Sequence, residues 1–263
     1  MSKLKYLIVV MITVALLPSL SYAQNAEQRG LEIAQAAEAY DSGFTDFTAN
    51  MIMTLRSKSG KTSSRKIRVK TLEIENDGDK SLTIFDQPAD VKGTAMLTFS
   101  HGLEADDQWL YLPALKKVKR INSRNKSGPF MGSTFAFEDL SSQEIEKYSY
   151  KFLGEEACGE WQCYVIDRKP EYKYSGYTRQ VTWLDKEAYR VVKVEFYDRK
   201  KALLKTLVTS DFNQYLGHYW RPGKMDMVNH LTGKGTLLEW TDYQFQTGLS
   251  DRDFRSQSLK RIK

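Results

Sequence analysis

Apolar and polar residues alternate with a period of two in short segments from residue 47 almost to the C-terminus, and this pattern constrains the fold most. In the first segment one face is apolar: Phe47, Ala49, Met51, Met53 and Leu55. The residues of the other face are mostly polar: Thr48, Asn50, Thr54 and Arg56. Such alternation predicts a strand that buries one face and leaves the other toward solvent.

Further strand patterns follow along the chain, separated mostly by short turns. They cover residues 65–75, 82–85, 95–99, 108–112, 117–121, 148–153, 162–168, 177–184, 190–197, 203–212, 219–229 and 236–245. The turn sequence Asn76-Asp77-Gly78-Asp79 is typical of the connections between them. About a dozen antiparallel strands predict a mainly β (α+β) fold, either a large curved sheet or an open barrel.

The N-terminus predicts a secretory signal peptide over residues 1–23. Lys3 and Lys5 precede an apolar run over residues 6–17, and Ser21-Tyr22-Ala23 supplies the small residues that signal peptidase reads. The apolar run is too short to cross a bilayer, which takes about 20 residues. We therefore expect cleavage after Ala23 and export to the periplasm as a soluble protein. Residues 24–263 then form one domain.

One helical pattern follows the expected cleavage site. Asn25 can cap it, Leu31 and Ile33 are among its apolar positions, and Gly43 suits its C-terminal end. A second, short helix is expected over residues 251–255. The sheet is thus expected to carry few helices.

The two cysteines predict a disulfide. Cys158 and Cys163 flank a turn that contains Gly159, with a strand pattern on either side. In an oxidising compartment such a pair is typical of a structural bridge across a hairpin. A redox or metal-binding pair is the alternative, and the lack of a nearby His argues against it.

Residues 122–142 interrupt the strand rhythm. The segment combines Gly128, Gly132 and Ser133 with large apolar side chains, and it ends in a possible helical turn at residues 138–140. Two interpretations stay open: the segment is a fixed part of the core, or it is a movable lid over an apolar cavity. The candidate cavity and lid residues are Phe47, Met51, Met53, Leu55, Phe85, Met96, Phe130, Met131, Phe135, Phe137 and Leu140. Flexible methionine side chains adapt to irregular ligands, which favours the lid.

The residues give little support for an enzyme. His101, His218 and His230 lack a metal-ligand spacing, and the chain has no nucleophile elbow or glycine-rich phosphate loop. We expect no catalytic residue, metal or cofactor.

The chain is weakly basic, with 39 Lys and Arg against 33 Asp and Glu spread along its length. This distribution disfavours nucleic acid as a partner, and an anionic membrane surface suits an envelope protein better. Two basic stretches, Arg65-Lys66-Ile67-Arg68-Val69-Lys70 and Lys116-Lys117-Val118-Lys119-Arg120, are interpreted as solvated sheet faces or, alternatively, as docking sites for phospholipid or protein.

The middle of the chain resembles the outer-membrane lipoprotein-sorting protein family, the relatives of the periplasmic lipoprotein carrier LolA. The resemblance rests on residues 109–121, which begin Trp109-Leu110-Tyr111-Leu112-Pro113, on Phe130-Met131-Gly132-Ser133 and on Phe137-Glu138-Asp139-Leu140. It implies an open antiparallel β-barrel or half-barrel, curved around a hydrophobic cavity and covered by an N-terminal helix and a helical or loop lid. The chain lacks the N-terminal acylation Cys of the anchored receptor LolB.

The resemblance implies a function as a periplasmic carrier. The expected cargo is lipid or the acyl chains of lipoproteins, moved toward the outer membrane. The expected partners are an inner-membrane exporter of the resistance-nodulation-division (RND) type or an outer-membrane acceptor, with transient contact to the membrane surface. The alternatives are an envelope sensor or binding module on the same fold, and a hydrolase of envelope lipids or glycans.

Overall fold

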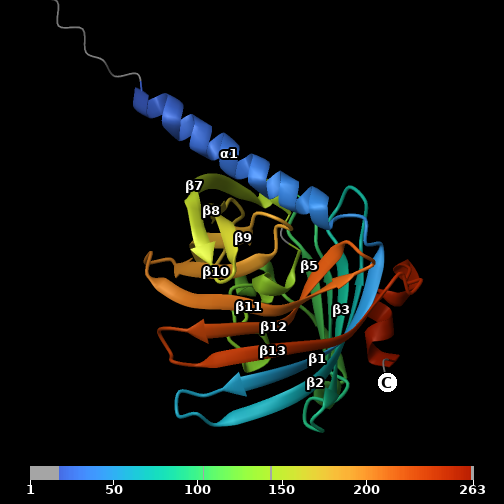
Figure 1. The fold of residues 1–263 in the computed structure, drawn as a ribbon. Helices are drawn as coiled ribbons and strands as arrows, with labels where there is room; N and C mark the ends of the chain where they lie inside the picture. Colours follow the sequence, from blue (N-terminus) through green and yellow to red (C-terminus); the bar gives the residue numbers. More distant parts are fainter. Residues whose placement is uncertain (1–17, 103, 143, 262–263) are drawn as a thin grey trace, which may run out of the picture.

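The computed structural model describes residues 18–102, 104–142 and 144–261. Its thirteen strands form one antiparallel sheet (Figure 1). The strands are β1 (Asp46–Arg56), β2 (Thr62–Leu72), β3 (Lys80–Gln87), β4 (Ala95–Phe99), β5 (Asp107–Leu112), β6 (Lys117–Arg120), β7 (Tyr148–Cys158), β8 (Trp161–Pro170), β9 (Tyr177–Asp185), β10 (Val191–Asp198), β11 (Leu203–Tyr215), β12 (Tyr219–Asn229) and β13 (Gly235–Phe245). All strands expected from the alternation are present, with ends that differ by a few residues.

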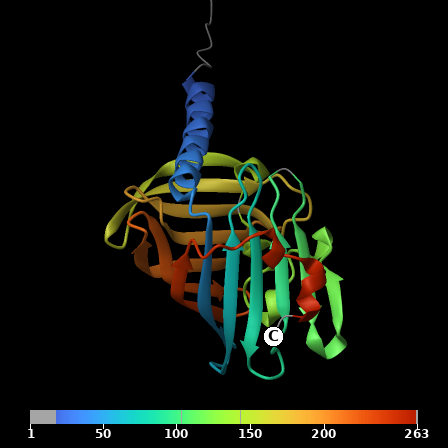
Figure 2. The ribbon, with the colours of Figure 1, turned by 90° about the vertical axis from the view of Figure 1, so that its right-hand side faces the viewer.

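The sheet is an open half-barrel. Its strand order is β6-β5-β4-β3-β2-β1-β13-β12-β11-β10-β9-β8-β7, so each strand pairs with its neighbour in sequence except where β1 joins β13. The two edge strands are β6 and β7, which follow one another along the chain. The sheet curves strongly between these edges (Figures 1 and 2). Residues 121–147, which we call the crossing segment, connect one edge to the other.

The crossing segment consists of short 3-10 turns rather than strands. They are η2 (Ser123–Asn125), η3 (Phe130–Gly132), η4 (Phe137–Leu140) and η5 (Ile145–Lys147). The helical turn expected at residues 138–140 is therefore present as η4. A further turn, η1 (Pro113–Leu115), joins β5 to β6.

The N-terminal helix α1 (Pro18–Asp41) packs against the β7 end of the sheet (Figure 1). Its inner side shares an apolar cluster with the first strands of that end: Ile33, Ala34, Tyr148, Tyr150, Ile166 and Leu184. Gly30 lies so close to β7 that a Cβ there would be 2.7 Å from the backbone of Lys151 and Phe152. The expected helix over residues 25–43 is thus found, and it begins earlier. It runs through the expected cleavage site after Ala23, and residues 1–17 of the expected signal peptide lie outside the described residues.

The C-terminus covers the outer face of β2–β5. The turns η6 (Asp251–Asp253) and η7 (Ser256–Arg261) take the place of the single helix expected over residues 251–255 (Figure 2). They bury Phe254 and Leu259 against outward apolar residues of the sheet: Leu72, Leu82, Ile84, Ala95 and Leu97.

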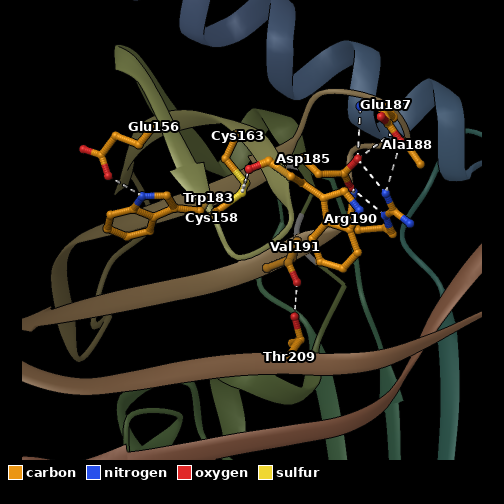
Figure 3. Close-up of a disulfide and its surroundings, with 11 residues drawn as sticks. Glu156, Cys158, Cys163, Trp183, Asp185, Glu187, Ala188, Arg190, Val191 and Thr209 are labelled. Carbon is orange, nitrogen blue, oxygen red and sulfur yellow. Dashed lines mark hydrogen bonds and ion pairs between the residues drawn. A yellow bond between two sulfur atoms is a disulfide. The ribbon is translucent and has the colours of Figure 1, made fainter.

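The predicted disulfide is confirmed. Cys158 and Cys163 are bonded across the β7–β8 hairpin, with their Cα atoms 5.9 Å apart. Gly159, at the turn, has a positive φ of 69°, which glycine adopts without strain. Next to the bridge, the fully buried Asp185 binds the Arg190 guanidinium at 2.8 and 3.0 Å (Figure 3). Bridge and ion pair together stabilise this end of the half-barrel.

Candidate ligand-binding interior

The concave face of the sheet is apolar because one side of each strand is apolar. Met51 and Met53 of β1 are 5% and 1% exposed, and the residues between them face outward. Strands on both sides of β1 add buried side chains to the same cluster: Ile67, Val69, Phe85, Met96, Leu110, Val194, Phe196, Leu207, Met227 and Leu238. Residues far apart in sequence thus form one apolar lining.

The crossing segment fills this interior. Phe130 and Phe135 are 1% and 3% exposed and belong to the same apolar cluster as the sheet lining. The Phe130 ring packs against Phe85 at 5.8 Å and against Phe137 at 5.6 Å between ring centroids. An acyl chain can therefore occupy the lining only where these rings move away.

A buried ion pair attaches the segment to β11. Lys205 Nζ donates to Asp139 Oδ2 at 2.5 Å and to the Thr134 carbonyl oxygen at 3.1 Å. The other oxygen of Asp139 accepts a hydrogen bond from the Tyr177 hydroxyl at 2.8 Å. Burial and the charge of Asp139 raise the pKa of Tyr177 well above its usual value, so this hydroxyl keeps its proton. Because the two charges are buried, each is stabilised only while the other is present.

Glu138 attaches the same turn to the β8–β9 connection. Its carboxylate accepts hydrogen bonds from the Tyr172 hydroxyl, the Ser175 hydroxyl and the Gly176 amide at 3.0, 2.9 and 2.8 Å. Burial raises the pKa of Glu138, and the three donors partly offset that effect. The turn η4 is therefore bound on two sides.

Further hydrogen bonds hold the middle of the segment. Arg65 of β2 donates to the carbonyl oxygen of Met131 at 2.6 Å, and the Thr134 amide donates to Thr236 Oγ1 at 2.9 Å. Gln108 Nε2 donates to the carbonyl oxygen of Phe137 at 2.9 Å. These contacts join the segment to β2, β5 and β13, which belong to both halves of the sheet.

Both ends of the segment meet at Asp106. Lys126 Nζ lies 3.0 Å from Asp106 Oδ2, and Lys147 Nζ pairs with the other carboxylate oxygen. Burial alone would raise the pKa of Asp106, but the hydrogen bonds and charges of the two lysines outweigh it and lower this pKa. Burial lowers the pKa of Lys126. The segment is a loop with fixed ends and an inserted apolar middle.

The structure brings most of the predicted cavity and lid residues together. Met51, Met53, Phe85, Met96, Phe130 and Phe135 are buried in one cluster, and four more pack against it: Leu55, Met131, Phe137 and Leu140. Phe47 lies apart from them, half-buried among the rings of Phe44, Tyr243 and Phe245. Their role in binding a ligand remains a prediction.

The sequence analysis missed the polar groups that hold the segment. Lys205 follows Leu203 and precedes Leu207 at positions that share one face of the alternation, so a charge at an inward position was the available signal. Its partner Asp139 was read only as part of a family motif. Charges at inward positions require a partner because an unpaired buried charge is strongly destabilising.

The first basic stretch does not form a single solvated face. Arg65 faces inward toward Met131, whereas Arg68 binds Asp86 at 2.7 and 2.8 Å and Lys70 lies 3.5 Å from Asp253. The second stretch, Lys116 to Arg120, lies on the edge strand β6 and its turn, where its cations are exposed.

Other chemistry is sparse among the described residues. They contain no cluster of three or more side chains that could hold a metal ion. His101 binds Asp77 at 2.9 Å in a surface turn, which agrees with the expected solvated loop. None of the helices in the described ranges is long and apolar enough to span a membrane.

Comparison with known proteins identifies the family. A crystal structure of an outer membrane lipoprotein-sorting protein domain from Vibrio parahaemolyticus is 58% identical, with a TM-score of 0.88 over 89% of this chain and 100% of that one. The chain belongs to the outer-membrane lipoprotein-sorting protein family. A DUF1329 family protein from Desulfovibrio piger is 30% identical, with a TM-score of 0.85 over 89% of this chain and 99% of that one.

More distant similarity confirms the expected fold. A LolA superfamily protein from Nitrosomonas europaea is 21% identical, with a TM-score of 0.69 over 86% of this chain and 97% of that one. A family model described as "Uncharacterized protein" matches residues 77–261. No curated protein matches the chain. The open LolA-like half-barrel expected from the sequence is therefore confirmed.

Proposed function

We propose that this family member is a periplasmic carrier that binds lipid or lipoprotein acyl chains inside the half-barrel, for transfer toward the outer membrane. One observation carries the proposal: a continuous apolar lining is covered by a separate segment of chain rather than by the sheet itself. The name of the Vibrio relative, a lipoprotein-sorting domain, supports the same function.

The energetics of an acyl cargo require such an enclosed lining. Each buried methylene is worth about 0.8 kcal/mol, so a chain of about 14 carbons loses on the order of 11 kcal/mol when it meets water. The rings of Phe130 and Phe135 protect the lining when no cargo is present. Cargo then replaces their apolar contacts with its own, which keeps the exchange close to balanced.

The filled interior also supports a second function, that of an envelope binding or sensing module. In that case Phe130 and Phe135 stay in the core, and a partner protein binds outside. This alternative requires no lipid and no movement of the crossing segment.

The proposed location and partners follow from the sequence. The signal peptide pattern of residues 1–23 supports export to the periplasm. The family resemblance supports an RND-type exporter in the inner membrane or an acceptor at the outer membrane as the partner. The proposal assigns no chemical reaction to the chain.

An acylated peptide and the same peptide without its acyl chain test the carrier. We expect the purified protein to bind the acylated form and not the other, measured by titration with a fluorescent label on the peptide. Mass spectrometry of protein purified without detergent should also detect bound lipid. Equal binding of the two peptides would support the binding module and contradict the carrier.

A further inference from the structure

The antiparallel order places alternate turns at opposite rims of the sheet. One rim carries the turns at residues 57–61, 88–94, 113–116, 171–176, 199–202 and 230–234. The other carries those at residues 73–79, 100–106, 159–160, 186–190 and 216–218. Figure 2 shows three turns of the first rim, β1–β2, β3–β4 and β5–β6, along the lower edge of the molecule, with α1 at the opposite end.

Neighbouring turns of the first rim lie against one another. A Cβ on Gly233, in the β12–β13 turn, would lie 3.2 Å from Cγ of Lys58 in the β1–β2 turn. A Cβ on Gly93, in the β3–β4 turn, would lie 3.3 Å from Cγ of Pro113 in the β5–β6 turn. The rim is thus a continuous border.

Charge is divided sharply between the two rims. The first rim contains nine exposed cations: Lys58, Lys61, Lys92, Lys116, Lys173, Arg199, Lys200, Lys201 and Lys234. Only Asp90 and Glu171 oppose them in these turns. The second rim has the reverse composition, with Lys186 and Arg190 against eight acids: Glu73, Glu75, Asp77, Asp79, Glu104, Asp106, Glu160 and Glu187. We call them the basic rim and the acidic rim.

The lysines of the basic rim are not used inside the protein. Within the part of the chain that the structure describes, none of these eight lysines forms an ion pair with a carboxylate. The same turns expose two leucines, Leu231 at 63% and Leu115 at 53%. Unpaired cations around exposed leucines suit a lipid bilayer better than an acidic protein, because the headgroups attract the cations and the interface accepts the leucines.

The apolar tip of the crossing segment lies toward the basic rim. Met131 is held by Arg65, near the start of β2, and Thr134 by Thr236, near the start of β13. Both strands begin at that rim. A surface hollow of about 470 Å³ also opens there, lined by Ile52, Arg65, Pro88 and Ala89 among others. The ends of the segment are instead fixed to Asp106, at the acidic rim.

We propose that the basic rim docks on an anionic phospholipid bilayer, with the tip of the crossing segment facing the lipid. The acidic rim then points away from the membrane, because its charges are repelled. This orientation puts the place where the interior can open next to the source of acyl chains. Docking can be measured whether or not the interior takes up cargo, so it stands or fails separately from the carrier function.

Vesicle binding with a charge-reversal variant tests the proposal. The variant Lys61→Glu, Lys92→Glu and Lys200→Glu changes three turns of the basic rim. The matched control, Lys151→Glu, Arg252→Glu and Arg255→Glu, changes the net charge equally at exposed positions away from it. Each protein is co-sedimented with vesicles of phosphatidylglycerol and phosphatidylcholine, and with vesicles of phosphatidylcholine alone, at low and high salt.

We expect the unmodified protein and the control to bind the anionic vesicles in a salt-sensitive manner. The rim variant should bind about 100-fold more weakly or worse, because each cation near an anionic surface contributes about a factor of five. Equal loss in the control would show that only net charge matters and would overturn the proposal. So would the absence of binding by the unmodified protein, which would leave an acidic protein as the occupant of this rim.

Discussion

Lys205 and Asp139 form the buried contact on which the position of the crossing segment depends most. The side chains of the pair are 3% and 6% exposed, and the hydroxyl of Tyr177 completes the coordination of the carboxylate. Charges so well removed from water are stable only as a pair. The contact is therefore a point where one substitution releases the segment.

Lys205→Met should lower the free energy of unfolding by about 3–5 kcal/mol, since it leaves the carboxylate of Asp139 buried without its partner. The double variant Lys205→Met with Asp139→Asn should regain much of that loss. Lys193→Met is the matched control, because Lys193 pairs with Glu195 at a more exposed site and should cost about 1 kcal/mol or less. Urea unfolding measures all three, and equal effects at Lys205 and Lys193 would contradict the buried pair.

Asp79 makes stability depend on pH in the direction opposite to that of most carboxylates. Burial, with repulsion from Glu144 and Glu73, raises its pKa from 3.8 to about 7. The folded state therefore binds a proton that the unfolded state releases, and this contribution to stability is lost as pH rises from about 4 to about 7.

Asp79→Asn should therefore increase stability by roughly 1–2 kcal/mol at about pH 8 and change it little at about pH 5. Asp77→Asn is the control at the same turn, because hydrogen bonds from His101 and from backbone amides outweigh burial and lower the pKa of Asp77. Unfolding free energies at the two pH values measure the effect. A gain at low pH only would contradict a raised pKa for Asp79.

At the scale of elements, the strands could be predicted and the crossing segment could not. The alternation at Met51 and Met53 depends only on local sequence, and so does the hairpin that joins Cys158 to Cys163. The position of Phe130 and Phe135 depends instead on β1 pairing with β13, which closes the sheet around them. Nothing local in the sequence specifies that pairing. Phe47 was misplaced because β1 has an irregular register between Thr48 and Asn50.

The close approach of α1 to β7 gives a prediction at this scale. Gly30→Ala should destabilise the protein by about 1–3 kcal/mol, because the added Cβ would lie 2.7 Å from the backbone of Lys151 and Phe152. Helix propensity alone would give the opposite sign, a gain of up to about 1 kcal/mol. Gln28→Ala, at an exposed position of α1, is the control and should change little. A stabilised Gly30→Ala variant in thermal unfolding would contradict the docking of this helix.

At the scale of the whole molecule, the sequence indicated a weak basic excess and hid its arrangement. Lys58 and Lys234 are far apart in sequence, yet their turns are adjacent at the basic rim. The acids of the opposite rim nearly cancel these cations in the net charge. Only the strand order separates the two groups, which is why composition could predict a membrane partner in general but not the surface that meets it.

The central claim is that the crossing segment must leave the interior for an acyl chain to enter. Arg65→Cys with Met131→Cys places one thiol on β2 and one on the segment, where an arginine side chain already spans the gap. A short bis-maleimide joins the two thiols, and a mono-maleimide blocks them without joining them. The native bridge between Cys158 and Cys163 stays oxidised throughout.

The deciding measurement is the uptake of a fluorescent fatty acid by these two preparations. The account predicts that the protein with blocked thiols binds the probe and that the cross-linked protein does not. Equal uptake by both preparations would contradict it, because an acyl chain would then enter without displacing the segment.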